Sequence, residues 1–249
     1  MKYTGCLIIN ILFLSCSTLD YNCLEEPKYD NNCIYIKHAA YSVVYSKSNK
    51  QPVWVAYQLL SSELNHKFLR TNNFYIDSLV ISGTANNSDF KYSGYDKGHL
   101  APAFDMSFDK IAMSESFSFT NISPQLPSFN RGIWKILEIK VRAWADLYDC
   151  LYLTTGSICF NSTKSIGENK ITIPTYFYKT ILIYNDSIQQ GIGFLIPHEN
   201  CKKDIFNYAV TIDSIEKFSN LDFYYKLPNR KEQKIESVFE ETFWRNNIK

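Results

Sequence analysis

Short runs rich in β-branched and aromatic residues recur along the chain and predict strands. Residues 33–36 and 40–46 have this character, and the polar run 47–51 separates them from a third run at 52–59. The simplest interpretation of 40–59 is a two-stranded hairpin. Further strands are predicted at 116–123, where polar and apolar residues alternate, and at 151–155, 171–183 and 190–196.

Helical periodicity is confined to two places. An apolar stripe at three- and four-residue spacing predicts a helix over 129–148, and it comprises Ile133, Leu137, Val141, Trp144 and Tyr148. A shorter helix is expected around 212–218, with Thr211 or Asp213 as its cap. Between these elements and the first hairpin, residues 61–95 are polar and irregular, and a loop of that length in a compact domain is usually functional.

The pattern as a whole predicts one α+β domain, with a mixed or antiparallel central sheet and flanking helices. The composition agrees, since 45% of the 249 residues are hydrophobic and 20% are charged. The net charge of +1 argues against a protein that coats nucleic acid as histones do. It does not exclude a local basic site, because phosphate contacts depend on where the charges lie.

The N-terminus resembles an export signal. Lys2 precedes an apolar stretch at 5–16 that suits a signal-peptide core and is too short to span a membrane. Its end at Cys16 resembles a bacterial lipoprotein signal, whereas cleavage to a secreted protein and no processing are the alternatives. We therefore expect an exported protein, either a bacterial membrane lipoprotein attached by a lipidated Cys16 or a periplasmic or secreted protein.

The predicted organisation is a signal peptide at 1–16, an extended lead-in at 17–33 and a single domain at 34–249. The seven cysteines show no CxxC spacing, so a structural zinc site is not expected. Their pairing cannot be read from the sequence, although Cys23 and Cys33 could close a short loop.

Candidate chemistry lies in the segment Asp96-Lys97-Gly98-His99. A histidine with a free ring nitrogen is a natural general base near neutral pH, and the preceding glycine gives its backbone room for an unusual turn. Taken alone, one histidine in a polar loop is more often structural. Asn130 at the start of the predicted helix would by itself be a cap, and a lone Glu138 in that helix would be solvated. On an ideal helix these two lie about 80° apart, on neighbouring parts of one face.

The segments DKGHLAPA, TNISPQ and FNRGIWKILE together resemble the DNA/RNA non-specific endonuclease family, the endonuclease G-like ββα-metal nucleases. The spacing from His99 to Asn130 and on to Glu138 fits the family signature, and the resemblance covers roughly 40–228. It implies a ββα-metal finger as the active site. His99 would be the general base, Asn130 the one protein ligand of Mg²⁺, with Mn²⁺ as a candidate substitute, and Glu138 would hold metal-bound water.

The resemblance also implies roles for residues around these three. Lys97 and Arg131 become candidates for phosphate contact, and Asp96, Gly98 and Asn121 become supporting residues. Lys97 stands where the family has arginine. Lysine keeps the charge but lacks the planar fork that grips phosphate, so reduced turnover is expected, and the nearby Arg70 is a candidate substitute for a second family arginine.

The implied function is a metal-dependent, sugar-non-specific endonuclease that hydrolyses phosphodiester bonds in DNA and RNA and leaves 5′-phosphate ends. Its partners would be DNA and RNA, bound through the phosphate backbone, and a second copy in a homodimer. One alternative is a catalytically degenerate member that binds nucleic acid or a partner protein. The other is a phosphodiesterase that acts on a different substrate.

Overall fold

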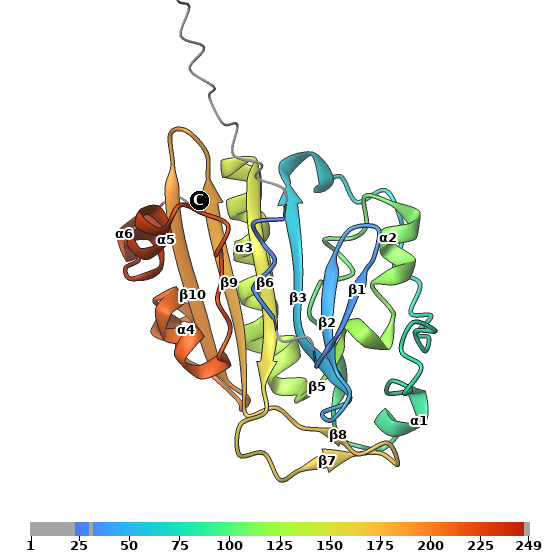
Figure 1. Cartoon of the computed structure of the whole chain (residues 1–249). Coiled ribbons are helices and arrows are strands. Elements are labelled where there is room, and N and C mark those ends of the chain that lie inside the picture. The colour runs from blue at the N-terminus through green and yellow to red at the C-terminus, as the bar shows by residue number, and fades with distance from the viewer. Residues whose placement is uncertain (1–22, 30–31, 247–249) are drawn as a thin grey trace, which may run out of the picture.

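A central antiparallel sheet organises the protein. The computed structural model describes residues 23–29 and 32–246, so the predicted signal peptide at 1–16 and the first part of the lead-in lie outside the described residues. Seven strands form the sheet, and every neighbouring pair is antiparallel (Figure 1). In spatial order they are β1 (Ile34–Lys37), β2 (Ser42–Ser46), β3 (Gln51–Leu60), β6 (Cys150–Ile158), β9 (Tyr176–Tyr184), β10 (Gln189–Pro197) and β11 (Ala209–Val210).

Two small hairpins and six α-helices accompany the central sheet in the described part of the chain, together with short 3₁₀ and π-helical turns. The hairpins pair β4 (Asp96–His99) with β5 (Ile122–Gln125), and β7 (Ser165–Ile166) with β8 (Ile171–Thr172). The helices are α1 (Asn87–Phe90), α2 (Lys110–Glu115), α3 (Lys135–Tyr148), α4 (Ile212–Ser219), α5 (Asn229–Glu236) and α6 (Glu241–Asn246). Among these described helices, none combines the length and apolar character that a membrane crossing requires.

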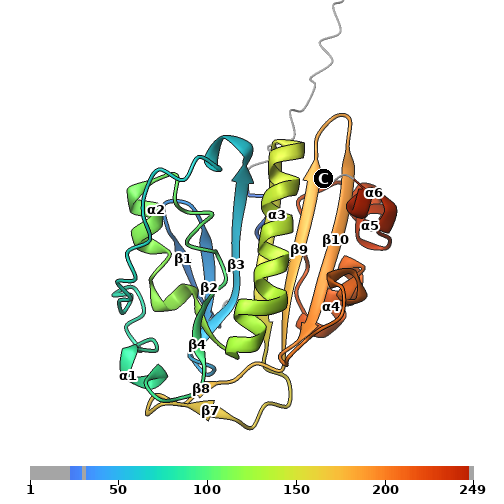
Figure 2. The ribbon, with the colours of Figure 1, turned by 180° about the vertical axis from the view of Figure 1, so that it is seen from behind.

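The sheet separates two apolar layers, because successive side chains of a strand point to opposite faces. Phe177 and Ile181 of β9 join the main core, where α3 lies across one face of the sheet (Figure 2). Tyr178 and Leu182 of the same strand pack on the other face, against a cluster that α4 and α5 supply. The returning α6 packs on α3, where the rings of Trp144 and Trp244 meet edge to face.

Most of the predicted strands are confirmed, as is the α+β class with an antiparallel central sheet. The hairpin predicted over 40–59 is the β2–β3 pair. The run predicted over 171–183 is divided into β8 and β9 by residues 173–175, which include a proline that cannot donate to a ladder. The short C-terminal helix begins as expected, and the Thr211 hydroxyl accepts the cap bond from Ser214 N at 3.2 Å.

The strand predicted over 116–123 is wrong. Residues 119–121 form a 3₁₀ turn, and β5 begins only at Ile122. The alternation that suggested a strand comes from hydroxyl side chains that are buried rather than solvated. Ser118 and Thr120 donate to the Asp77 carboxylate at 3.1 and 3.0 Å, so polar and apolar residues are both interior here.

The helix predicted over 129–148 begins differently from an ideal helix. Residues 129–134 form a wide π-helical turn, interrupted at Gly132, and α3 proper starts at Lys135. The angle expected between Asn130 and Glu138 assumed one continuous α-helix and does not apply. The wide turn instead turns Asn130 toward Asp96 on β4.

Candidate active site

A ββα unit brings the predicted site residues together. In the β4–β5 hairpin, His99 stands opposite Ile122 and Asp96 opposite Gln125. The chain then passes through the π-helical turn into α3, and Figure 2 shows β4 beside the N-terminal end of that helix. Asn130 on the turn therefore bonds Asp96 on the strand that ends in His99, and the charge of Arg70 acts on both His99 and Glu138.

His99 lies in an apolar setting that keeps its imidazole neutral. The side chain is 7% exposed, with the Phe117 ring perpendicular to it at 4.9 Å and the Phe74 ring at 5.5 Å. Burial lowers the pKa of His99 to about 3, and the charge of Arg70 lowers it further against a hydrogen bond to the Lys97 backbone. The other ring nitrogen, Nε2, is buried and has no hydrogen-bond partner among the described residues. The arrangement presents one oriented lone pair.

Asp96 fixes the orientation of Asn130. The Asn130 amide nitrogen donates to Asp96 Oδ2 at 2.9 Å, and Arg131 donates to both carboxylate oxygens at 2.9 and 2.6 Å. Burial raises the pKa of Asp96, but the bonds from Arg131 and Asn130 outweigh it and the net shift is downward. Because the amide nitrogen is committed to Asp96, Oδ1 is the Asn130 atom left to meet a cation.

Gly98 is required for space rather than for a turn. It lies within β4, and a Cβ at this position would overlap Oε1 and Cδ of the Gln125 side chain across the hairpin. The expected special turn before His99 is therefore absent from this hairpin, because the segment is regular strand. Gln125 itself is fully buried, so its side chain has little room to withdraw.

Asn121 holds the segment that follows His99. Its buried side chain accepts from Ala101 N at 2.8 Å and donates to the Ala101 and Ser116 carbonyls at 2.9 Å each. Its backbone carbonyl also accepts from Leu100 N at 3.0 Å. The amide thus ties the end of β4 to the turn before β5.

The three basic residues of the site differ in their contacts and in their exposure. Lys97 donates to Asn87 Oδ1 at 2.7 Å and lies 4.0 Å from the centre of the Phe74 ring. Arg131 is 71% exposed and held by Asp96. Arg70, from the long loop, stacks 5.2 Å over the Phe117 ring, and its charge acts on both His99 and Glu138.

Glu138 is a half-buried carboxylate within a group of charges. Burial raises its pKa to about 7, and the nearby Asp105 raises it in the same direction. The charges of Lys179, Arg142 and Arg70 oppose that rise. Glu138 is therefore poised near neutral pH, where its charge responds to small changes in its surroundings.

Sequence reasoning did not identify Lys179, which lies in β9 and whose charge acts on Glu138. The side chain is 1% exposed, donates to the Thr155 hydroxyl and lies 5.5 Å from the Trp134 ring. Burial lowers its pKa to about 8, against the attraction of Glu138 and Asp105. The available signal was a single charged residue in the otherwise uncharged strand YFYKTILIY, since a buried lysine needs a partner.

These features define a class of protein in which a ββα unit on one side of an antiparallel sheet presents a neutral histidine and an asparagine just before a helix. The chain belongs to the DNA/RNA non-specific endonuclease family, whose model matches residues 22–230. The predicted family is thereby confirmed.

Individual relatives agree with this assignment. Mitochondrial endonuclease G of Bos taurus is 29% identical over 200 residues, which cover 74% of this chain and 67% of the relative. Nuclease C1 of Cunninghamella echinulata var. echinulata is 28% identical over 215 residues, covering 78% and 83%. A solved EndoG/EndoGI complex contains a chain that superposes with a TM-score of 0.76 at 26% identity, covering 83% of this chain and 90% of that one. The prediction of a hydrolase of the nuclease type is confirmed.

The predicted location is wrong. We expected a bacterial membrane lipoprotein or a periplasmic or secreted protein, but similar relatives from cattle, human and yeast are mitochondrial nucleases. The apolar segment and Cys16 on which that expectation rested lie outside the described residues. A short apolar stretch after a lysine is a weak pattern, since it specifies no particular membrane.

Proposed function

We propose that this protein is a metal-dependent endonuclease that hydrolyses the phosphodiester backbone of DNA and RNA at its ββα unit. The observation that carries the proposal is the neutral, buried His99 with an unpartnered Nε2 among the described residues. Few other roles suit such a group, because an unpartnered buried nitrogen costs about 1–3 kcal/mol unless a ligand or water uses it.

His99 would act as the general base. Its ring is oriented by the Lys97 backbone and by two phenylalanines, so Nε2 can accept a proton from a water without rotating. A pKa far below neutral keeps the lone pair available at every physiological pH. The resulting imidazolium would be short-lived in this setting, which favours rapid return of the proton to solvent.

Asn130 and Glu138 suit a Mg²⁺ ion that keeps most of its water. The fit rests on Asn130 Oδ1, which the Asp96 bond to the amide nitrogen leaves directed away from that carboxylate. Mg²⁺ prefers oxygen ligands and dehydrates reluctantly, so one amide oxygen is a sufficient protein ligand. Glu138 would accept hydrogen bonds from the ion's waters, and Mn²⁺ is a candidate substitute. When bound, the ion would neutralise charge on the phosphate.

Phosphate contact would come from Arg70 and Lys97. Arg70 has the planar fork and acts on both His99 and Glu138, whereas Lys97 supplies a point charge. Arg131 would act through Asp96 instead, as a residue that positions Asn130. Contacts of this kind reach phosphate rather than base edges, which explains cleavage with little sequence preference.

The test is a plasmid-nicking and RNA-degradation assay of the purified protein with Mg²⁺ and with EDTA. We expect cleavage in Mg²⁺ alone, lost in His99→Ala and retained in the matched control His66→Ala, which removes an exposed histidine. Cleavage that survives His99→Ala would refute the assigned base. No cleavage with any divalent ion, with DNA binding intact, would favour the catalytically degenerate alternative.

Two further expectations remain proposals. The homodimer implied by the resemblance would be tested by light scattering over a range of protein concentrations. The single domain at 34–249 would be tested by limited proteolysis, which should release no stable internal fragment.

A further inference from the structure

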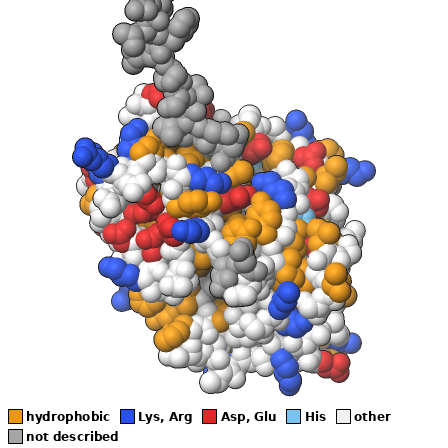
Figure 3. Space-filling view, viewed as in Figure 1, with side chains coloured by type: hydrophobic (Ala, Val, Ile, Leu, Met, Phe, Trp, Pro, Cys, Tyr) orange, Lys and Arg blue, Asp and Glu red, His pale blue; other side chains and the backbone are white. Residues whose placement is uncertain are grey.

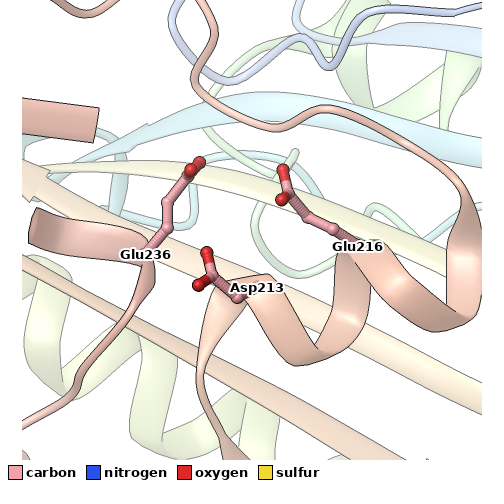
Figure 4. Close-up of side chains that lie close together, drawn as sticks. All are labelled: Asp213, Glu216 and Glu236. Carbon is pink, nitrogen blue, oxygen red and sulfur yellow. The ribbon is translucent and has the colours of Figure 1, made fainter. Parts of the chain in front are cut away.

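Three carboxylates meet on the face of the sheet opposite α3. Asp213 and Glu216 come from α4, and Glu236 comes from the end of α5. One oxygen from each lies within 4.8 Å of the others, and Figure 4 shows the three side chains directed toward one another. Acidic side chains gather on this side of the molecule in Figure 3. We call this group the acidic cluster.

Glu236 distinguishes the acidic cluster from ordinary surface charge. The residue is only 5% exposed, and its Oε1 is buried with no hydrogen-bond partner within the described part of the chain. Glu216 is partly engaged, since one of its oxygens accepts from Phe223 N at 2.9 Å. A buried acceptor aimed at two other carboxylates requires a donor or a cation.

The acidic residues around Glu236 make its negative charge still less favourable. Burial raises its pKa to about 9, and the strongest electrostatic influences on it, from Glu216, Glu232, Asp213 and Asp222, all act in that direction. Near neutral pH the side chain must therefore take up a proton or be compensated by a cation. The geometry favours a cation, because two separate helices direct three carboxylates to one point.

The helices that carry the acidic cluster are held close to the sheet. Ile212 and Ile235 pack over Gly191, where an added Cβ would lie 2.7 Å from each of them. Both isoleucines belong to the apolar cluster on this face. Since this packing holds α4 and α5 against the sheet, the two helices cannot move apart to relieve the repulsion between their carboxylates.

We propose that the acidic cluster of Asp213, Glu216 and Glu236 binds a Ca²⁺ ion that links α4 to α5. Ca²⁺ takes six to eight oxygen ligands in flexible geometry, which suits carboxylates from two helices together with water. Mg²⁺ keeps most of its water and is not expected to draw three carboxylates together. The site lies on the opposite side of the sheet from His99 and Asn130, so its role is stabilisation rather than catalysis.

The test is thermal unfolding of the full chain in EGTA and in Ca²⁺, with Mg²⁺ constant in every sample. Ligand that binds only the folded state raises Tm, by about 5–10 °C at a Ca²⁺ concentration 100 times Kd for a domain of this size. Asp213→Asn and Glu236→Gln should each abolish most of this shift. The matched control Glu168→Gln, an exposed carboxylate in the β7–β8 turn, should retain it.

One additional variant and two further conditions make the outcome decisive. In EGTA, Glu236→Gln should unfold at or above the wild-type Tm, because an uncompensated charge is removed. Asn130→Ala should keep the full Ca²⁺ shift, which would separate this ion from the proposed active-site metal. An absent shift, a shift that persists in Asp213→Asn, or an equal shift from raising Mg²⁺ alone would overturn the proposal.

Discussion

Replacing Glu138 with glutamine should stabilise the protein while it reduces activity. The carboxylate is half-buried beside Asp105, and the nearby cations only partly compensate it. Glutamine has almost the same shape but carries no charge. The substitution therefore removes an electrostatic penalty of folding together with the group that we propose to hold the waters of the metal ion.

The size of the effect follows from the pKa of Glu138. A rise from 4.5 to about 7 means that the folded protein binds this proton more tightly than the unfolded chain does. The contribution to stability is thus fully present below pH 4.5 and is lost as pH rises toward and through 7. At about 1.36 kcal/mol per pH unit the upper value is about 3 kcal/mol. Since Glu138 retains some contact with water, we expect the advantage of Glu138→Gln to grow by about 1–2 kcal/mol between pH 5 and pH 8.

Urea unfolding of wild type and Glu138→Gln in EDTA, at several pH values from 5 to 8, measures this difference. Titrating groups that do not interact with Glu138 cancel in the comparison, whereas Lys179, whose pKa Glu138 raises, contributes to the difference. Asp146→Asn, an exposed carboxylate on the same helix, is the matched control and should show no such trend. In Mg²⁺, Glu138→Gln should lose about 10–100-fold in kcat/KM. A glutamine variant that is less stable than wild type at pH 8, or a difference that does not change with pH, would refute the reasoning.

Three further predictions concern the ββα unit. Gly98→Ala should destabilise by about 1–3 kcal/mol in urea unfolding, because the new Cβ overlaps Gln125, and adding Gln125→Ala should recover part of the loss. Asn121→Ala should cost about 2–4 kcal/mol, since it leaves buried backbone groups unpaired, and a loss below 1 kcal/mol would contradict this role. By NMR, the His99 imidazole should remain neutral from pH 8 down to pH 5, as its pKa near 3 requires; a midpoint near 6.5 would show that the ring is solvated.

The sheet was largely predictable because its signal is local. The β-branched and aromatic content of β3 and β10 predicts these strands, and the polar run before β3 predicts the turn. The failure at 116–123 has a physical cause in Asp77, a distant carboxylate that gives interior partners to Ser118 and Thr120. No local pattern distinguishes a hydroxyl that faces water from one that faces a buried acid.

The candidate-site residues that belong to a sequence motif were predictable. Those that only the folded structure brings together were not. His99, Asn130 and Glu138 became candidates through the resemblance of their motifs to the endonuclease family. The bond from Asn130 to Asp96 follows from the π-helical turn, which ideal helix geometry does not anticipate. The charge of Lys179 acts on Glu138 although β9 and α3 are distant in sequence, and this interaction exists only after the sheet has formed.

Glu138 and Glu236 both have raised pKa values, but they lie on opposite faces of the sheet and differ in what surrounds them. Glu138 has three cationic side chains nearby, so the protein itself limits the cost of its charge and holds its pKa near neutrality. Glu236 has acidic neighbours as its strongest influences, and nothing comparable offsets them. A carboxylate whose negative charge is balanced by nearby cations can gain and lose hydrogen bonds during turnover. A carboxylate with only acidic neighbours needs a proton or a bound cation to balance its charge. This contrast separates the proposed catalytic site from the proposed structural ion site more sharply than the number of acidic residues in either place.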